Sequence, residues 1–112
     1  MWQKGIRLVK QIYLITQHFP SEERFELVAQ MRRAAVSIPS NLAEGQARHT
    51  RGEFVQFVSH AEGSNAELHT QLIIAVEPGY CTKEQARAAF ELIAELKKML
   101  NALRRTLQSN DK

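Results

Sequence analysis

The sequence predicts an all-α protein, an antiparallel, up-down-up-down four-helix bundle that occupies residues 1–112 as a single domain. Apolar residues recur at intervals of three and four along most of the chain, which is the period of an amphipathic helix. Proline, glycine and helix-capping residues divide this pattern into four segments, at about residues 2–17, 22–47, 51–77 and 83–109. Joints this short favour antiparallel neighbours, and the chain length is that of one domain.

The first segment, residues 2–17, carries more apolar surface than one bundle core needs. Its apolar residues spread over about half of the helix circumference; they are Trp2, Ile6, Leu8, Val9, Ile12, Tyr13 and Ile15. Leu14 adds an apolar side chain on the otherwise polar side. The surplus predicts a second contact surface, and Ile6, Tyr13 and Leu14 are our candidate residues for an interface between protomers of a homo-oligomer.

The second segment, residues 22–47, follows Pro20, and Ser21 is a candidate N-cap for it. The residues spaced for its core face are Val28, Met31, Ala35, Ile38 and Leu42. Pro39 lies inside this segment, where it removes a hydrogen bond and crowds the preceding turn. We therefore expect a kink or a local break near residues 36–40.

The third and fourth segments, residues 51–77 and 83–109, each begin with a capping box, Thr50 with Glu53 and Thr82 with Gln85. The third has a heptad-like seam of Phe54, Phe57, Ala61, Ser64, Leu68, Gln71 and Ala75. The fourth repeats Ala86, Ala89, Ile93, Leu96, Leu100, Leu103 and Leu107 at the same spacing. Residues 110–112 are expected to fray.

The excess positive charge is confined to residues 31–51. This stretch holds Arg32, Arg33, Arg48 and Arg51 against a single acid, Glu44, and the difference equals the formal net charge of +3 of the whole chain. Arg33, Ser37, Asn41, Glu44 and Arg48 fall on one side of the expected helix, opposite its core face. A second basic cluster near the end of the chain contains Lys97, Lys98, Arg104 and Arg105.

Both basic features have two interpretations. The strip formed by Ser37, Asn41 and Glu44 with its flanking arginines could bind phosphate, because arginine offers bidentate donors and serine and asparagine add positioning contacts. The same strip could instead be a satisfied polar interface, between protomers or across the bundle, with Glu44 paired to an arginine. The second cluster could equally be a solvated face at the end of a helix whose dipole it complements.

Several classes of function lack their sequence signals. His60 and His69 are nine residues apart and so point to opposite sides of one helix, which argues against a metal site. Cys81 has no cysteine partner, and no hydrolase elbow, phosphate loop or dinucleotide motif occurs. No apolar run approaches the length of a membrane span, about 20 residues. We expect a cytoplasmic bacterial protein with no catalytic site, no cofactor and no contact with membranes.

The motif QMRRAAVSIPSNLAEGQAR, followed by EFVQFVSHAEGSNAELHTQLIIA and then GY, resembles the four-helix-bundle family named for proteins encoded in 23S rRNA intervening sequences. The resemblance covers nearly the whole chain. It implies a ring-shaped assembly, typically a homopentamer, with no established enzyme activity. Accessory proteins of diversity-generating retroelements are similar in architecture; they are pentamers that bind nucleic acid and a reverse transcriptase.

Two functional hypotheses follow. In the first, a homo-oligomer binds RNA or DNA, or acts as a nucleoprotein adaptor that also contacts a nucleic-acid-processing protein. The basic residues that would carry this function are Arg32, Arg33, Arg48, Arg51, Lys97, Lys98, Arg104 and Arg105. In the second, the protein is a protein–protein interaction scaffold whose arginines are used within its own interfaces.

Overall fold

A computed structural model describes residues 1–109; residues 110–112, expected to fray, lie outside the described part. It contains the four α-helices α1 (Trp2–Thr16), α2 (Ala29–Gln46), α3 (Arg51–Val76) and α4 (Lys83–Ser109). Two short helical turns precede α2, the 3-10 turn η1 (Ser21–Glu23) and the π turn η2 (Arg24–Val28). Residues 1–109 contain no strand, so the described chain is all-α.

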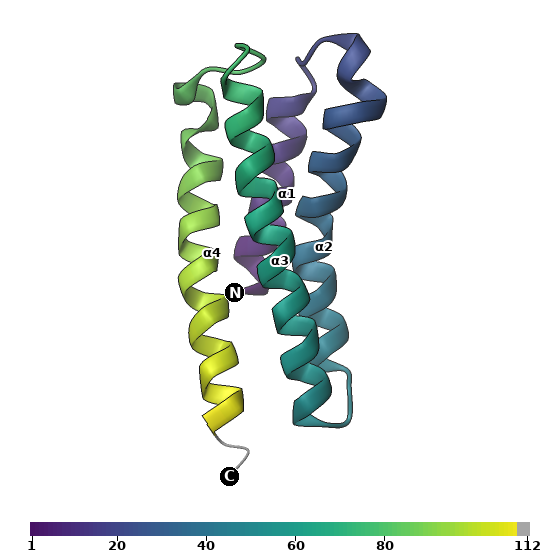
Figure 1. The fold of residues 1–112 in the computed structure, drawn as a ribbon, viewed down its shortest axis with the longest axis vertical. Helices are drawn as coiled ribbons and strands as arrows, with labels where there is room; N and C mark the ends of the chain where they lie inside the picture. Colours follow the sequence, from purple (N-terminus) through teal and green to yellow (C-terminus); the bar gives the residue numbers. More distant parts are fainter. Residues whose placement is uncertain (110–112) are drawn as a thin grey trace.

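The four helices lie side by side along one long axis, in a body that measures 50 × 23 × 19 Å. α1 packs beside α2 and α4, and α3 packs beside α2 and α4, so each helix has two neighbours around a common core. Figure 1 shows that the α1–α2 and α3–α4 connections lie at one end of the molecule. The α2–α3 connection lies at the other end, together with the C-terminal end of α4.

The core contains the seams expected on α2 and α4. All five residues predicted for the core face of the second segment are buried, as are Ala86, Ala89, Ile93, Leu96 and Leu100 of α4. The last two residues of the predicted α4 seam, Leu103 and Leu107, are half-buried against this core. On α3, the buried row is Val58, Ala61, Asn65, Leu68, Leu72 and Ala75, together with Gln71. Phe57 and Ser64 are half-buried, so the α3 seam is rotated from the predicted one. Because Phe57 and Val58 are adjacent apolar residues, the heptad spacing fits either row and does not by itself select the buried one.

The joint between α1 and α2 differs from the sequence prediction. The second segment does not form an α-helix from residue 22, because η1 and η2 occupy residues 21–28 and α2 begins at Ala29. Ser21 makes no side-chain capping bond to the turn it begins. Phe19 and Val28 are both buried at this joint. The π turn between them has hydrogen bonds from residue i to residue i+5, so it holds one residue more than an α-helical turn.

The helix that contains Pro39 is not broken at this residue. α2 remains helical from Ala29 to Gln46 with buried Pro39 inside it, so of the two predicted forms, a kink or a local break, the local break is wrong. The side-chain amide of Asn41 donates to the backbone oxygen of Ser37 at 2.7 Å, in the turn that contains the proline. Gly5 of α1 leaves room for the ring, since a Cβ on Gly5 would lie 3.3 Å from the Pro39 Cβ. The packing of Pro39 against α1 and the burial of the neighbouring residues of α2 therefore outweigh the local free-energy cost of a proline inside a helix.

The other helix ends agree with their sequence signals. Glu53 donates its backbone N–H to the Thr50 hydroxyl at 3.1 Å, and Gln85 does the same to Thr82 at 3.0 Å. Thr82 also donates its backbone N–H to the Gln85 side chain at 2.9 Å, which completes this capping box. At Thr50 the N-cap bond is present, and the Thr50 hydroxyl donates to the Glu53 carboxylate at 2.9 Å. Within residues 1–109, no helix combines the length and the apolar character needed to cross a membrane.

Candidate functional site

Four of the predicted basic residues gather at one end of the bundle. Arg48 and Arg51 flank the α2–α3 connection, and Arg104 and Arg105 lie in the last turns of α4. These two segments are distant in sequence, but they reach the same end of the molecule (Figure 1). We refer to Arg48, Arg51, Arg104 and Arg105 as the basic end.

The arginines of the basic end differ in how they are held. The Arg48 guanidinium lies 4.8 Å from the centre of the Phe57 ring and 3.4 Å from the Glu44 carboxylate. Arg104 is half-buried and donates to Glu62 of α3 at 2.7 Å, which ties α4 to α3. Arg105 is exposed and makes no hydrogen bond or ion pair with the described residues.

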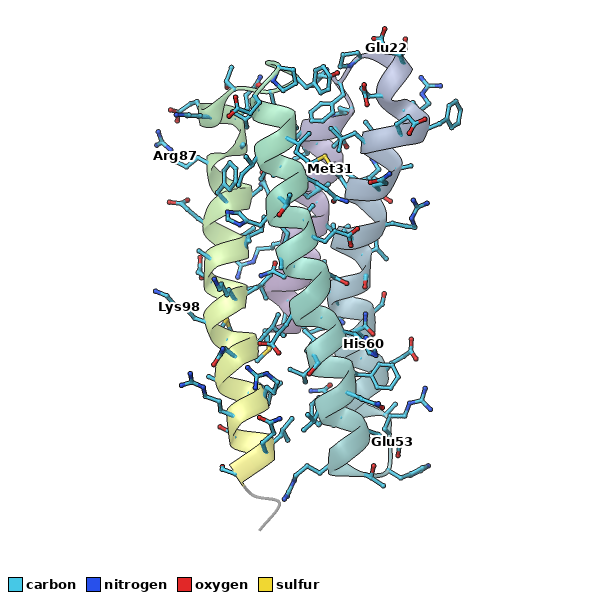
Figure 2. All side chains as sticks on the ribbon, in the orientation of Figure 1. Glu22, Met31, Glu53, His60, Arg87 and Lys98 are labelled. Carbon is cyan, nitrogen blue, oxygen red and sulfur yellow. The ribbon has the colours of Figure 1, made fainter. Side chains whose placement is uncertain are left out.

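The two lysines of the second cluster are separated from the basic end. Lys97 and Lys98 are exposed and lie nearer the middle of α4, where Figure 2 shows Lys98 pointing outward. Lys97 borders a groove of about 280 Å³ between α3 and α4 that Asn65 and His69 also line. The cluster predicted from the sequence therefore consists of two separate pairs.

The polar strip of α2 is mostly used inside the bundle. The hydroxyl oxygens of Ser37 and Ser64 of α3 are 2.7 Å apart, and Asn41 donates to the Ser37 hydroxyl at 2.8 Å. Glu44 pairs with Arg48, as described above. These contacts agree with the interpretation of the strip as a satisfied interface across the bundle.

Arg33, at the start of this strip, is exposed. It lines a groove of about 320 Å³ between α2 and α3, which Glu67 also lines. No hydrogen bond or ion pair joins Arg33 to any residue in the described part of the chain. It is therefore not buried against Glu44 or Glu67.

Arg32 lies apart from the other arginines of its stretch. Its guanidinium is 4.4 Å from the centre of the Tyr13 ring, and its Nε donates to the Thr16 hydroxyl at 3.0 Å. Both partners belong to α1, so Arg32 joins α1 to α2. It lies in the first turn of α2, near the α1–α2 connection, which is at the opposite end of the molecule from the α2–α3 connection (Figure 1).

The apolar surplus predicted for α1 remains uncovered in a single chain. Trp2, Ile6, Val9 and Tyr13 follow one another at helical spacing, and the side chains of Trp2 and Tyr13 are 47% and 44% exposed. Trp2 lines a shallow hollow with Ala43 of α2, and the Tyr13 ring lies against Arg32 of α2. Val36 is exposed and lies at helical spacing between Arg32 and Ala43, so it is on the side of α2 that adjoins these α1 residues. We call Trp2, Ile6, Val9, Tyr13 and Val36 the α1–α2 face.

Leu14 does not belong to this face. It is 56% exposed, but it lies about 100° around α1 from Tyr13. The structure therefore brings Ile6 and Tyr13 together and separates Leu14 from them.

Some exposed residues gave no clear signal in the sequence. Phe25 is 85% exposed on the π turn, and Ile73 and Ile74 are exposed on α3. Arg24 faces a cavity at the α1–α2 joint. The directions of Phe25 and Arg24 depend on the π turn, which an α-helical pattern cannot predict.

The remaining reactive groups are held in structural contacts. Cys81 is buried, and this burial raises the pKa of its thiol above the ordinary value. The Tyr80 hydroxyl donates to Glu23 at 3.1 Å, and this hydrogen bond raises the pKa of Tyr80. The hydrogen bond from Lys4 lowers the pKa of Glu95 and links α1 to α4. Among the described residues, no three His, Cys, Asp or Glu side chains are grouped to hold a metal ion.

Comparisons with known proteins give the fold and the family. The chain is similar to a solved structure from Bacteroides thetaiotaomicron, described as a protein with unknown function from the S23 ribosomal protein family. The TM-score is 0.84 at 21% identity, over 92% of this chain and 96% of the other, and at this identity the likeness shows the fold alone. No curated protein matches the chain. A family model described as 23S rRNA-intervening sequence protein matches residues 1–102, and the chain therefore belongs to this family.

Proposed function

We propose that this protein is a non-enzymatic homo-oligomer that binds RNA or DNA, or acts as a nucleoprotein adaptor, through its basic end. The observation that carries the proposal is the gathering of Arg48, Arg51, Arg104 and Arg105 at one end of the bundle. The family description, which refers to 23S rRNA, supports a nucleic-acid context. The proposed assembly is a ring of antiparallel, up-down-up-down bundles, with five chains, in the bacterial cytoplasm.

The state of each arginine suits phosphate binding to a different degree. An exposed ion pair such as Arg48 with Glu44 contributes little stability, so Arg48 can exchange its carboxylate for a phosphate. Arg104 is more strongly held by Glu62 and mainly fixes α4 against α3. In a ring, each weak set of contacts is repeated once per protomer, and the summed binding exceeds that of one chain.

A titration of fluorescent RNA and DNA, followed by anisotropy at low and moderate salt, tests this function. The variant Arg48→Gln/Arg105→Gln should bind more weakly to every sequence. The slope of log affinity against log salt should fall by roughly 0.7 to 0.9 for each arginine–phosphate pair that the variant removes. A matched control is Lys83→Gln/Arg87→Gln, which removes the same charge at the opposite end of the molecule (Figure 2).

Light scattering should show the same oligomer for both variants. The control should retain most of the wild-type affinity, and an equal decrease in the two variants would contradict a site at the basic end. Binding that survives in the basic-end variant and disappears on replacing Lys97 and Lys98 would move the site to the middle of α4.

A protein–protein scaffold is the second candidate function, and one observation favours it. Glu44 and Glu62 already pair with two of the four arginines of the basic end, which weakens the case for free phosphate donors. If the wild-type protein binds neither RNA nor DNA at low salt, the scaffold becomes the better account.

A further inference from the structure

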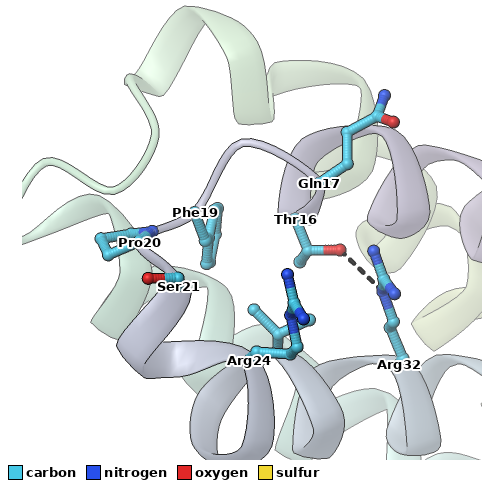
Figure 3. Close-up of a pocket in the computed structure, with 8 residues that line it drawn as sticks. Thr16, Gln17, Phe19, Pro20, Ser21, Arg24 and Arg32 are labelled. Atoms are coloured by element: carbon cyan, nitrogen blue, oxygen red, sulfur yellow. Dashed lines mark hydrogen bonds between the residues drawn. The ribbon is translucent and has the colours of Figure 1, made fainter.

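A cavity of about 370 Å³ lies at the α1–α2 joint, at the opposite end of the bundle from the basic end. The C-terminal end of α1, the two short turns and the first part of α2 enclose it (Figure 3). Its lining residues are Thr16, Gln17, Phe19, Pro20, Ser21, Arg24, Val28 and Arg32. The two charged side chains among them are both arginines.

Arg32 is held in place at one side of this cavity. Its Nε donates to the Thr16 hydroxyl, and its guanidinium lies over the Tyr13 ring. Thr16 is 3% exposed and its hydroxyl donates to the Ile12 backbone oxygen at 2.6 Å, so the acceptor of Arg32 is itself fixed. The N–H groups of the two terminal nitrogens of Arg32 remain available to a ligand, in a fixed fork geometry.

Arg24 points into the same cavity from the π turn. Figure 3 shows the guanidinium groups of Arg24 and Arg32 on the same side of Thr16. In an unbroken α-helix, residues eight apart differ in direction by about 80°. The π turn between them adds one residue without adding its usual rotation of about 100° around the helix axis. The difference in direction between Arg24 and Arg32 is thereby reduced to about 20°. The turn therefore aligns the two arginines, and such turns occur often at functional sites.

Neither arginine of this pair is held by a carboxylate of residues 1–109. Neither Arg24 nor Arg32 forms an ion pair with a described residue, and neither has an acidic residue three or four positions away. Glu23, adjacent to Arg24 in sequence, instead accepts a hydrogen bond from Tyr80. Two positive charges at one cavity repel each other. A bound anion would attract both guanidinium groups and so offset their mutual repulsion.

We infer that this cavity binds the phosphate group of a phosphate monoester. Two guanidinium groups match the charge of a phosphate dianion and can each donate two parallel hydrogen bonds to it. The cavity is within the volume range of small-ligand sites. Phe19, Pro20 and Val28 supply an apolar wall for the organic part of the ester. This site goes beyond the proposed function, since it does not depend on the basic end.

A structural role for the same arginines gives a different expectation. The C-terminal carbonyl groups of α1 border the cavity, and α1 has no basic residue in its own last turn. Arg24 and Arg32 would then only complement the negative end of the α1 dipole. In that case phosphate would compete poorly with the carbonyl groups and would not bind.

Isothermal titration with inorganic phosphate, at neutral pH and constant ionic strength, separates these two roles. Wild type should bind phosphate saturably, and Arg24→Gln should weaken the affinity about tenfold or more. Arg24 is exposed and bonds to no described side chain, so this variant should keep its fold. The matched control is Arg33→Gln, which removes the same charge from a neighbouring helical position that faces another groove.

NMR provides a second readout at the site itself. The Arg32 Nε–H signal should shift on phosphate addition in wild type and in Arg33→Gln, and in Arg24→Gln the same shift should need about tenfold more phosphate or higher. Absence of saturable phosphate binding by wild type would overturn the inference, as would an equal decrease of affinity in Arg24→Gln and Arg33→Gln.

The phosphate could come from a free small ester or from the end of a nucleic acid. Two oligoribonucleotides of one sequence, with a 5′-phosphate or a 5′-hydroxyl, distinguish these sources. An advantage of the 5′-phosphate that Arg24→Gln removes would assign the site to nucleic-acid ends. Equal binding of both, together with Arg24-dependent binding of inorganic phosphate, would assign it to small esters. The inorganic phosphate result holds even if the basic end binds no nucleic acid.

Discussion

Single polar residues in the core show how closely α3 and α4 are matched. Asn65 is 3% exposed, and its side-chain N–H donates to the backbone oxygen of Ile93 on α4 at 3.0 Å. Its side-chain oxygen is buried and accepts no hydrogen bond from the described residues. The hydrogen bond depends on a donor at this position, because the partner is a carbonyl oxygen that cannot donate.

The variant Asn65→Asp should be destabilised in a pH-dependent way. Burial would raise the folded-state pKa of the new carboxyl above its unfolded value, and only the protonated form can donate to Ile93. The contribution of the new carboxyl to the free energy of unfolding is therefore most favourable at acid pH and is lost as the pH rises through the folded-state pKa. At neutral pH we expect a decrease of more than about 2 kcal/mol in the free energy of unfolding.

Urea unfolding of this variant and of wild type, at neutral and mildly acid pH and at one protein concentration, measures the effect. The difference in the free energy of unfolding between wild type and Asn65→Asp should become smaller as the pH falls. Asn101→Asp is the control, since Asn101 is only half-buried and should tolerate a carboxylate at both pH values. A deficit of the same size at both pH values would show that the hydrogen bond to Ile93 is not the cause.

At the scale of elements, glycine allows α2 to approach α3 near the basic end. A Cβ added to Gly45 would lie 2.9 Å from the Phe57 Cβ and 2.9 Å from the Phe54 ring. Gly63 lies within α3 and a Cβ there would meet nothing within 4 Å. The two glycines therefore differ in packing while both belong to helices.

Alanine substitutions at these two positions should have opposite effects on stability. Gly63→Ala should stabilise the protein by about 0.5 to 1 kcal/mol, because alanine loses less backbone entropy in a helix. Gly45→Ala should destabilise it by about 1 to 3 kcal/mol, since the clash with the two aromatic residues exceeds this gain. Thermal unfolding of both variants tests this, and stabilisation by Gly45→Ala would mean that α2 can shift against α3 at little cost.

The elements also show where sequence patterns are sufficient. The capping boxes at Thr50 and Thr82 act within four residues, so local sequence determines both helix starts. The fate of Pro39 depends on Gly5, which lies on another helix, and local propensity predicted a break that does not occur. The π turn also lies at a tertiary joint, where Val28 is buried, and an α-helical sequence pattern does not predict it.

At the scale of the whole molecule, the sequence indicated the charged residues but not their grouping. Arg48 and Arg105 belong to separate basic clusters of the sequence, and the segments that carry them reach the same end of the molecule. Arg32 lies beside Arg33 in the sequence, yet Tyr13 and Thr16 hold it at the α1–α2 joint. The sequence is compatible with Ser37 at a ligand or at an interface, and the Ser64 hydroxyl beside it favours the interface across the bundle.

The α1–α2 face leads to a prediction about assembly. Exposed apolar side chains on two adjacent helices are typical of a contact surface between chains, and we expect a homo-oligomer, with five chains implied by the family resemblance. Val36 of this face is 40% exposed, so a glutamate in its place would remain hydrated in a single chain. The carboxylate would lose its water, at a cost in free energy, only when the interface between chains forms. Val36→Glu should therefore dissociate the oligomer and leave a folded helical monomer, because glutamate is a better helix former than valine.

Light scattering with circular dichroism measures both parts of this prediction. Leu14→Glu, which adds the same charge on a different side of α1, is the matched control and should keep the wild-type mass. Dissociation by Leu14→Glu, with Val36→Glu unaffected, would place the interface on the outer side of α1 instead. A monodisperse wild-type monomer at micromolar concentration would rule out the ring, and the basic end would then lack the avidity on which its binding depends.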